Sequence, residues 1–253
     1  MTDKYEENLN STESENLKTH APETEPTPTN KDDYGSIELF DDLDIDEKII
    51  MGVFGYGYEK PSPIQKRGIL PILAGRDVIA QAQSGTGKTA TFCIGTLGKI
   101  KPEENTTQAL ILAHTRELAL QIDTVFRQIG KHTDIRFNLS VKGISPRDNI
   151  EELKGGDDNK KPHIVIGTPG RVMDMIRKNA LSTNNIRLLV IDEADEMLSD
   201  GFIEQIHEIF VSLPQISKTA LFSATMNEHF FTITNKFMNN PVKILIKTET
   251  LTL

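Results

Sequence analysis

The sequence predicts an α/β fold in which a parallel sheet is covered by helices on both faces, giving three layers. Two observations carry this prediction. Short runs rich in β-branched residues alternate with amphipathic helical stretches, which is the order of strands joined by crossover helices in a parallel sheet. Most of these runs are apolar at nearly every position, as expected for strands that helices bury on both sides.

The strand candidates follow one another from residue 78 to residue 246. In a sheet of this kind, ligands bind in the crevice at the carboxyl ends of the strands, so the residues directly after each strand are the ones that bear on function. The predicted strands are residues 78–82, 109–113, 137–141, 164–167, 188–191, 219–222 and 242–246.

The helix candidates have apolar residues at three- and four-residue spacing, which places these residues on one face of a helix. In the first candidate, Ile45, Ile49 and Val53 recur every four residues, and Gly55 and Gly57 are expected to end the helix. Further helices are predicted over residues 64–73, 118–129 and 202–210.

Residues 1–35 have few large apolar side chains and many Glu, Thr, Asn and Pro residues. They cannot bury enough surface to offset their ordering entropy, so we expect a disordered acidic tail, with a partner-binding arm as the alternative. The tail accounts for −6 of the net charge of −9, which leaves −3 for residues 36–253. A broad basic face is therefore not indicated, although RNA contacts through backbone amides and a few arginines are compatible with this charge.

Composition excludes several classes of protein. No run of about 18 apolar residues is present, so no membrane association is expected, and residues 1–10 lack the features of a secretory signal. The single cysteine, Cys93, excludes an internal disulfide and a Cys-rich zinc site and fits a reducing compartment. We expect a cytoplasmic protein, with a nuclear location as the alternative.

The loop after the first predicted strand has the composition of a phosphate-binding loop. Gly87, Lys88 and Thr89 fit the end of the pattern G-x-x-x-x-G-K-[ST]. This triplet would also suit a glycine turn at a helix start, but the loop joins a strand to a helix, where backbone N–H groups converge on an anion. The predicted nucleotide-binding residues here are Ala82, Gln83, Ser84, Gly85, Thr86, Gly87, Lys88 and Thr89, with Ala82 in place of the first glycine.

Each part of this loop has an expected role. Gly85 and Gly87 let the backbone approach the phosphates without a Cβ clash. The Lys88 ammonium is expected on the β- and γ-phosphates, and the Thr89 hydroxyl is expected to bind Mg²⁺.

An acidic cluster, Asp192-Glu193-Ala194-Asp195, follows the fifth predicted strand. A carboxylate at the end of a strand that neighbours the phosphate loop is placed to hold Mg²⁺, usually through water. An adjacent carboxylate can position or deprotonate an attacking water. The same residues would also suit an acidic helix cap, but the phosphate loop upstream favours the metal and water roles.

In combination, these two motifs resemble those of the DEAD-box RNA helicases, and further matches follow in the order of that family. The resemblance covers about residues 37–253 and is greatest to the translation initiation factor 4A group and its nuclear relatives. The further matches are Phe40, an upstream aromatic residue that stacks on the base; residues 57–65, the Q motif that reads adenine; residues 115–119 and 168–171, two RNA-contacting motifs; and residues 223–225, the motif that couples hydrolysis to unwinding.

The resemblance implies a RecA-like P-loop domain at residues 36–247 that binds ATP and Mg²⁺ and couples ATP hydrolysis to RNA unwinding. Phe40 and Gln65 would hold adenine, and Thr89 and Asp192 would hold Mg²⁺. The expected catalytic residues are Lys88, Asp192 and Glu193, of which Glu193 would orient the attacking water.

The resemblance also implies a route from nucleotide to RNA, along Asp195, Ser223 and Thr225. RNA would be gripped through its backbone with little sequence preference, and translation-initiation or other helicase-binding proteins are the expected protein partners. Several matches have simpler explanations, since Thr168 precedes a proline and would cap a helix in any protein, but their joint order favours the family. The expected RNA-contacting residues are Arg116, Thr168, Gly170 and Arg171.

Two positions depart from the family pattern. His114 stands where the first RNA-contacting motif begins with proline, and Ile144 replaces the second of two paired glycines after Gly143. A β-branched residue is not expected to adopt the backbone conformations that glycine allows. Both changes fall on the expected RNA face and leave the ATP-binding residues intact.

Helicases of this family have a second α/β domain that supplies arginine fingers, and residues 248–253 would begin the linker to it. Arginine fingers contribute roughly 10³–10⁵ in rate, so we expect this chain by itself to bind ATP, to hydrolyse it very slowly and not to separate strands. The leading interpretation is one part of an ATP-dependent RNA helicase. The alternatives are a single-domain nucleotide-binding regulator that competes for helicase partners, and a scaffold that binds no nucleotide.

Overall fold

The computed structural model describes residues 34–198, 201–226, 228–235 and 237–246, which belong to the unit that begins at Tyr34. Apart from residues 34–35, the expected acidic tail lies outside the described residues, as does the expected linker at residues 248–253. Within the described ranges, none of the helices has both the length and the apolar character needed to cross a membrane.

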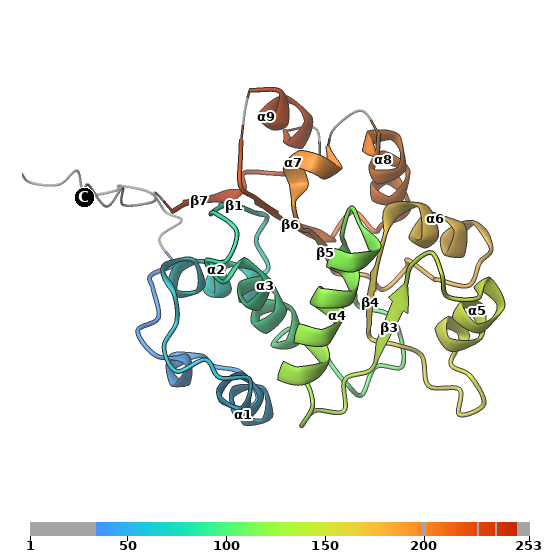
Figure 1. Cartoon of the computed structure of the whole chain (residues 1–253), viewed down its shortest axis with the longest axis horizontal. Helices are drawn as coiled ribbons and strands as arrows, with labels where there is room; N and C mark the ends of the chain where they lie inside the picture. Colours follow the sequence, from blue (N-terminus) through green and yellow to red (C-terminus); the bar gives the residue numbers. More distant parts are fainter. Residues whose placement is uncertain (1–33, 199–200, 227, 236, 247–253) are drawn as a thin grey trace, which may run out of the picture. The chain divides into compact units, whose positions relative to one another are not determined.

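The described strands form one parallel sheet in the order β3-β4-β2-β5-β6-β1-β7 (Figure 1). The predicted fold class is confirmed, and each predicted strand is found within one residue of its expected limits. The strands are β1 Val78–Gln81, β2 Ala109–Leu112, β3 Phe137–Ser140, β4 Ile164–Gly167, β5 Leu188–Ile191, β6 Lys218–Ser223 and β7 Val242–Leu245.

The helices include each one predicted from apolar spacing, together with short or more polar helices that this spacing did not show. Their bounds are α1 Glu47–Gly55, α2 Pro63–Leu73, α3 Lys88–Leu97, α4 Arg116–Ile129, α5 Pro146–Lys154, α6 Pro169–Arg177, α7 Ala194–Met197, α8 Ile203–Ser212 and α9 Glu228–Thr234, with a 3₁₀ turn η1 at Phe40–Asp42.

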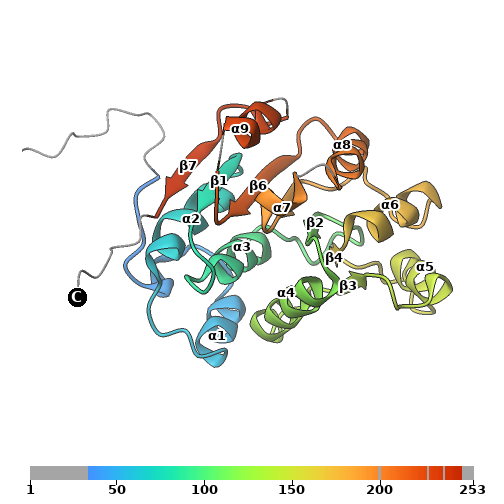
Figure 2. The ribbon, with the colours of Figure 1, turned by 45° about the horizontal axis from the view of Figure 1, so that its top comes forward.

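The sheet separates two apolar cores, because successive side chains of a strand enter opposite faces. Val78 and Ala80 of β1 pack in the core that α1 to α4 cover, while Ile79 between them packs in the core under α5 to α9. Figure 2 shows α2, α3 and α4 on one side of the sheet and α6, α7 and α8 on the other. This two-sided burial explains why the strand sequences are apolar at nearly every position.

Helices α2 and α3 approach one another closely because each presents a glycine at their contact. A Cβ atom on Gly68 would lie 2.5 Å from Thr91 Cγ2, and one on Gly95 would lie 2.8 Å from Ile72 Cγ2. Any larger side chain at these positions would force the two helices apart. The helix that follows the phosphate loop is therefore held directly against the helix of the Q-motif match.

The carboxyl ends of the parallel strands meet at one edge of the sheet, where the predicted site residues gather. One expectation about this edge is wrong. The strand that carries the acidic cluster, β5, does not neighbour β1, because β6 pairs with both and lies between them. Sequence order alone does not show this insertion, since β6 comes later in the chain than both of its partners.

Candidate functional site

The phosphate loop joins β1 to α3 and is shaped by two glycines in the left-handed region. Gly85 has φ 80° and Gly87 has φ 99°, conformations that strain other residues. Thr86 Oγ1 donates a hydrogen bond to Gln83 O at 2.7 Å, which closes the turn. Ser84 and Gln83 are exposed, so the outer part of the loop is open to a ligand.

Lys88 is the first residue of α3 and is only 8% exposed. Its Nζ donates a hydrogen bond to Ala82 O at 2.9 Å, so the ammonium turns back over the loop. Thr89 follows it in the first turn of α3 and is half-buried. The loop therefore encloses a positive charge whose partner is a neutral carbonyl, together with the free N–H groups of a helix start.

Asp192 lies directly after β5 and is 3% exposed. Burial raises its pKa to about 6, against the lowering effects of the Glu193 N–H, which donates to Asp192 Oδ1 at 3.0 Å, and of the Lys88 charge. The structure thus brings Lys88 and Asp192 within electrostatic reach of each other, from strands β1 and β5. A buried carboxyl group with a raised pKa beside a cation marks a site that is built for a charged ligand.

Glu193 has a left-handed backbone, with φ 49°, which is uncommon outside glycine, asparagine and aspartate. Such strain persists where the surrounding structure fixes it and is often found at functional sites. Its side chain is 38% exposed, and its Oε2 lies 3.0 Å from His114 Nδ1. Sequence reasoning identified His114 as a departure but not as the neighbour of Glu193; the register of β2 with β5 is the signal that places them together.

The three residues expected to relay nucleotide state are in contact. Asp195 Oδ2 accepts hydrogen bonds from Thr225 Oγ1 at 2.6 Å and from Thr225 N at 3.1 Å. Ser223 Oγ accepts from the same Thr225 N at 3.2 Å. Burial by itself would raise the pKa of Asp195, but the hydrogen bonds from Thr225 and Ser223 lower it below its ordinary value. This carboxylate therefore ties the segment after β5 to the segment after β6.

Gln65 is buried and lies between the start of α2 and the phosphate loop. Its Oε1 accepts a hydrogen bond from Ser62 N at 2.8 Å, and its Nε2 donates to Gly87 O at 3.4 Å. A Cβ atom on Gly87 would lie 2.7 Å from that Nε2, so only glycine fits beneath the amide. Sequence reasoning assigned Gln65 to adenine and missed this contact with the loop.

The structure does not place Phe40 where a base reaches it. Its side chain has no exposed surface, and its ring centroid lies 6.3 Å from that of Phe54 and 6.4 Å from that of Tyr58. A base can stack on Phe40 only if one face of its ring becomes accessible, so the adenine role of Phe40 stays a prediction. The sequence shows an isolated aromatic residue, but it does not show that residues from α1 and the following loop enclose it.

The expected RNA-contacting residues lie after β2 and β4 at the same edge of the sheet. Arg116 begins α4, whose N-cap is Thr115. Arg171 Nη1 donates to Ile144 O at 3.0 Å. Thr168 is at the N-cap position of α6, without a capping hydrogen bond from its side chain, and Gly170 is exposed in the first turn.

The two departures on this face lie next to residues that contact one another. As expected for a β-branched residue, the backbone of Ile144 is not in the left-handed region; the left-handed position is Gly143, with φ 101°. A Cβ atom on Gly143 would lie 2.6 Å from Arg116 Nη1. The glycine that remains is therefore the one that the turn and the arginine require.

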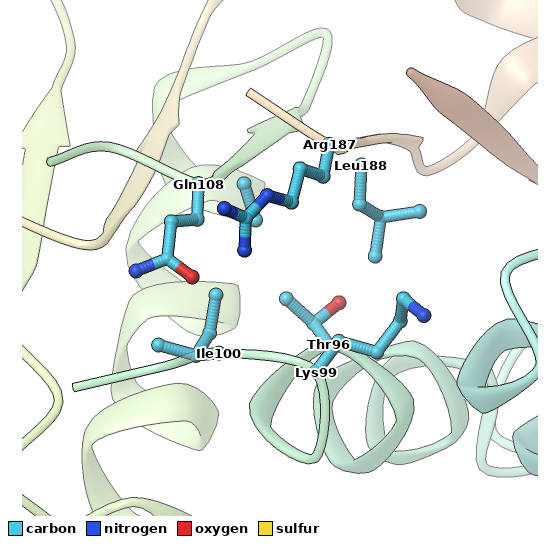
Figure 3. A pocket seen from close by; sticks show the side chains of 7 residues that line it. Thr96, Lys99, Ile100, Gln108, Arg187 and Leu188 are labelled. Carbon is cyan, nitrogen blue, oxygen red and sulfur yellow. The ribbon is translucent and has the colours of Figure 1, made fainter. Parts of the chain in front are cut away.

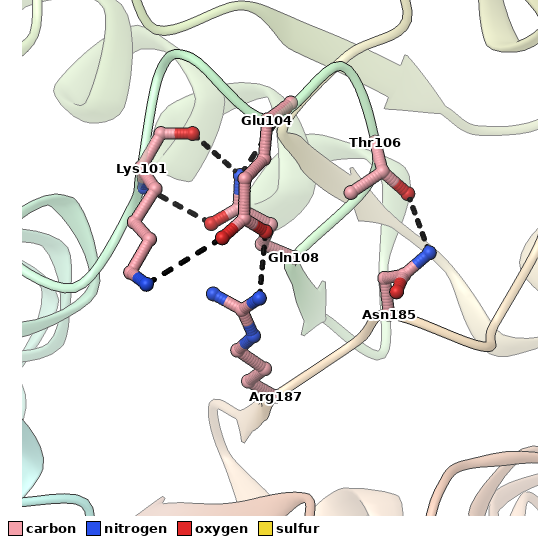
Figure 4. A network of polar contacts seen from close by, with 6 residues as sticks. All are labelled: Lys101, Glu104, Thr106, Gln108, Asn185 and Arg187. Atoms are coloured by element: carbon pink, nitrogen blue, oxygen red, sulfur yellow. Dashed lines mark hydrogen bonds and ion pairs between the residues drawn. The ribbon is translucent and has the colours of Figure 1, made fainter.

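The opposite edge of the sheet, where β2 and β5 begin, is closed by contacts within the protein. Glu104 accepts a hydrogen bond from Arg187 Nη2 at 2.6 Å and lies 3.5 Å from Lys101 Nζ (Figure 4). Beside this network, a cavity of about 20 Å³ between Thr96, Lys99 and their neighbours has room for about one water molecule (Figure 3). It is far too small for a nucleotide, and none of the predicted site residues lies here.

Comparisons with known proteins agree with this arrangement. Residues 62–232 match the DEAD/DEAH box helicase family. The ATP-dependent RNA helicase eIF4A of Debaryomyces hansenii is 54% identical over 217 residues, which are 86% of this chain and 53% of that protein. Eukaryotic initiation factor 4A of Caenorhabditis elegans is 50% identical over 217 residues, again 86% of this chain and 53% of that protein.

Solved structures show the same fold. A DEAD box protein from Methanococcus jannaschii is similar with a TM-score of 0.77 and 31% identity, over 84% of this chain and 57% of that chain. A Dbp5 variant of S. cerevisiae bound to RNA and ADP BeF3 has a TM-score of 0.74 and 34% identity, over 83% of this chain and 52% of that chain. The chain spans about half the length of the curated relatives it matches.

Proposed function

The chain belongs to the DEAD/DEAH box helicase family, and we propose that its residues 36–247 are the ATP-binding domain of an ATP-dependent RNA helicase of the translation-initiation type. One observation carries this proposal: Lys88 and Asp192 are both buried beside the phosphate loop, close enough that the Lys88 charge lowers the pKa of Asp192. The identity to eIF4A relatives supports the translation-initiation assignment.

The residues at this edge fit a triphosphate with a divalent cation. A Cβ atom on Gly85 would meet nothing within 4 Å, so the main chain there is open to an approaching phosphate. The raised pKa of Asp192 shows that its ionised form lacks a sufficient counter-charge. We assign Thr89 and Asp192 as the residues that hold Mg²⁺, which would neutralise phosphate charge when bound.

The chain's own residues then divide the work of hydrolysis. Lys88 leaves Ala82 O and places its ammonium on the β- and γ-phosphates, where it stabilises developing negative charge. Glu193 orients water for attack in line with the leaving oxygen. A displacement of the Asp192–Asp195 segment on hydrolysis would be passed by Asp195 to Thr225 and Ser223. The Asp195 carboxylate accepts hydrogen bonds from these two residues, which lie at and just after the end of β6.

Adenine would bind beside the Q-motif match. Gln65 lies between the start of α2 and the phosphate loop. A base that hydrogen bonds to the Gln65 amide would therefore act on the hydrogen bond between that amide and Gly87 O. Phe40 would join this site only after one face of its ring has become accessible.

RNA would bind across the ends of β2 and β4, through Arg116, Thr168, Gly170 and Arg171. A helix N-terminus such as that of α6 favours a phosphate, and the arginines add charge without sequence readout. We further propose translation-initiation proteins or other helicase-binding proteins as partners and the cytoplasm as the location.

Binding of a fluorescent ATP analogue with and without Mg²⁺ tests the proposal. Lys88→Ala removes a charge-assisted contact and is expected to weaken binding about 10- to 100-fold. The matched control is Lys99→Ala, which removes an ammonium that also donates to a main-chain carbonyl at 2.9 Å, but at the opposite edge of the sheet. Equal affinity of the wild type and Lys88→Ala would instead support a scaffold that binds no nucleotide.

A further inference from the structure

We propose that His114 is a positioning residue for Glu193: its Nδ1 holds the carboxylate that orients water, and it ties that carboxylate to the segment that carries Arg116. The effect of this contact on ATP hydrolysis rests on the proposed function, but the contact itself is present in the ligand-free fold. It gives a role to a residue that the family pattern does not predict.

The contact is set by the register of the sheet. Strands β2 and β5 are parallel neighbours, with Leu112 opposite Ile191, and Asp192 N donates to Leu112 O at 3.1 Å. His114 and Glu193 each come two residues after that pair, just past the ends of β2 and β5. The pairing of the two strands therefore brings together the segments that carry these residues.

The chemistry of the contact favours a stable pair. His114 Nδ1 lies 3.0 Å from Glu193 Oε2, and the two side chains are 23% and 38% exposed. The Nδ1 atom is buried and makes no hydrogen bond of good geometry to any residue that the structure describes. Leaving such a nitrogen without a partner is unfavourable, and the Glu193 carboxylate 3.0 Å away is placed to accept a hydrogen bond from it.

Among the residues that the structure describes, the other hydrogen bonds of Glu193 are made by its main chain. Its left-handed φ of 49° and the hydrogen bond from its N–H to Asp192 Oδ1 fix the backbone, but neither fixes the direction of a side chain with three rotatable bonds. The imidazole supplies that restraint. Proline, which begins the corresponding motif in the family, has no side-chain donor and cannot make this contact.

The pair also joins two functional segments. His114 precedes Thr115, whose Oγ1 accepts a hydrogen bond from Leu118 N at 3.2 Å and caps α4, and Arg116 follows at once. A displacement of the α4 N-terminus by RNA therefore moves the imidazole and, through it, the Glu193 carboxylate. In this chain the proposed RNA contact acts on hydrolysis by a direct side-chain link.

The first test needs no nucleotide. Thermal unfolding of the chain is measured for the wild type, His114→Ala, Glu193→Ala and the double variant. If the side chains interact, the change in Tm of the double variant differs from the sum of the two single changes. Additive changes would overturn the proposal, whatever the chain does with ATP.

The second test measures positioning. In single-turnover hydrolysis with chain in excess over ATP, His114→Ala is expected to be about tenfold slower, because a small misplacement of a reacting group is costly, while affinity for the fluorescent ATP analogue stays within about twofold. His114→Asn keeps an N–H donor near the Nδ1 position and is expected to recover most of the rate. An unchanged rate in His114→Ala, or equal losses in both variants, would contradict the proposal.

The two tests separate this inference from the proposed function. If the wild-type chain binds no ATP, the proposed function fails, and the unfolding cycle still decides whether His114 holds Glu193. If the wild type binds and hydrolyses ATP but the cycle is additive, the inference fails and the proposed function stands.

Discussion

At the scale of single residues, the Asp192 carboxyl group is the clearest sign that this edge of the sheet serves a ligand. The group is 3% exposed, and its pKa stays raised although Lys88 and the Glu193 N–H both act to lower it. A fold optimised for stability alone would avoid such a group. If Asp192 holds Mg²⁺ as we propose, the cation would supply the counter-charge that favours the ionised form, and stability would be traded here for binding.

Replacement of Asp192 by asparagine is expected to stabilise the ligand-free fold at neutral pH. Burial raises the pKa from 3.8 to about 6, so the folded state holds the proton more tightly than the unfolded state. The folded wild type therefore loses stability as pH rises through this window, up to a limit of about 3 kcal/mol. Because asparagine is neutral and of the same shape, the advantage of Asp192→Asn should be about 1 kcal/mol at pH 4.5 and about 3 kcal/mol at pH 7.5.

Urea unfolding of both proteins at the two pH values, without Mg²⁺ or nucleotide, measures this difference. The same variant should lose the Mg²⁺ dependence of nucleotide binding. The ionised Asp192 does not destabilise the fold if the variant is no more stable than the wild type at pH 7.5. The same conclusion follows if the difference in the free energy of unfolding is equal at both pH values.

At the scale of elements, apolar runs and spacing predicted the strands and the main helices, because each strand is buried on both sides and each main helix on one. The order of strands was not predictable, since β6 enters between β1 and β5 through contacts that no local pattern records. The burial of Phe40 was missed for a similar reason: it depends on Phe54 and Tyr58, which fold over it from later in the chain. The phosphate loop and acidic cluster were recognisable because their spacing is local.

The contact between α2 and α3 leads to a prediction at this scale. Gly95→Ala places a Cβ atom 2.8 Å from Ile72 Cγ2, so the helices must separate, at an expected cost of about 1–3 kcal/mol in the free energy of unfolding. Since α3 begins at Lys88, nucleotide affinity should fall as well. Both quantities are measured on the same protein, by urea unfolding and by binding of the fluorescent analogue.

Two further variants control this experiment. Gly201→Ala meets nothing within 4 Å and should be neutral. Ile72→Ala removes the Cγ2 and Cδ1 atoms that the new Cβ would meet, so the further cost of Gly95→Ala should be smaller in the Ile72→Ala background. If Gly95→Ala and Gly201→Ala have equal stability, close packing of α2 on α3 is not what positions the loop.

At the scale of the whole sheet, the residues proposed to bind nucleotide and RNA all lie at one edge. They follow the carboxyl ends of the strands, whereas the opposite edge carries the ion pairs of Glu104 with Arg187 and Lys101. The near-neutral charge of residues 36–253 means that RNA affinity depends on few contacts rather than on a broad basic face.

This division predicts which arginines matter for RNA. Arg171→Ala removes the guanidinium that lies over Ile144 O at the carboxyl edge and should weaken binding of a fluorescent single-stranded RNA about tenfold. Arg136→Ala is the control, because Arg136 Nε donates to Lys161 O at the opposite edge, at 2.7 Å. Fluorescence anisotropy at fixed salt measures both, and a larger loss for Arg136→Ala would mean that RNA binds elsewhere.

The most direct measurement is a crystal structure of the chain with a non-hydrolysable ATP analogue and Mg²⁺. We expect the triphosphate in the loop of residues 82–89, Lys88 Nζ moved from Ala82 O onto the phosphates, and the cation between Thr89 and Asp192. A nucleotide bound elsewhere, or a Lys88 that keeps its carbonyl contact while Asp192 faces no cation, would contradict the account.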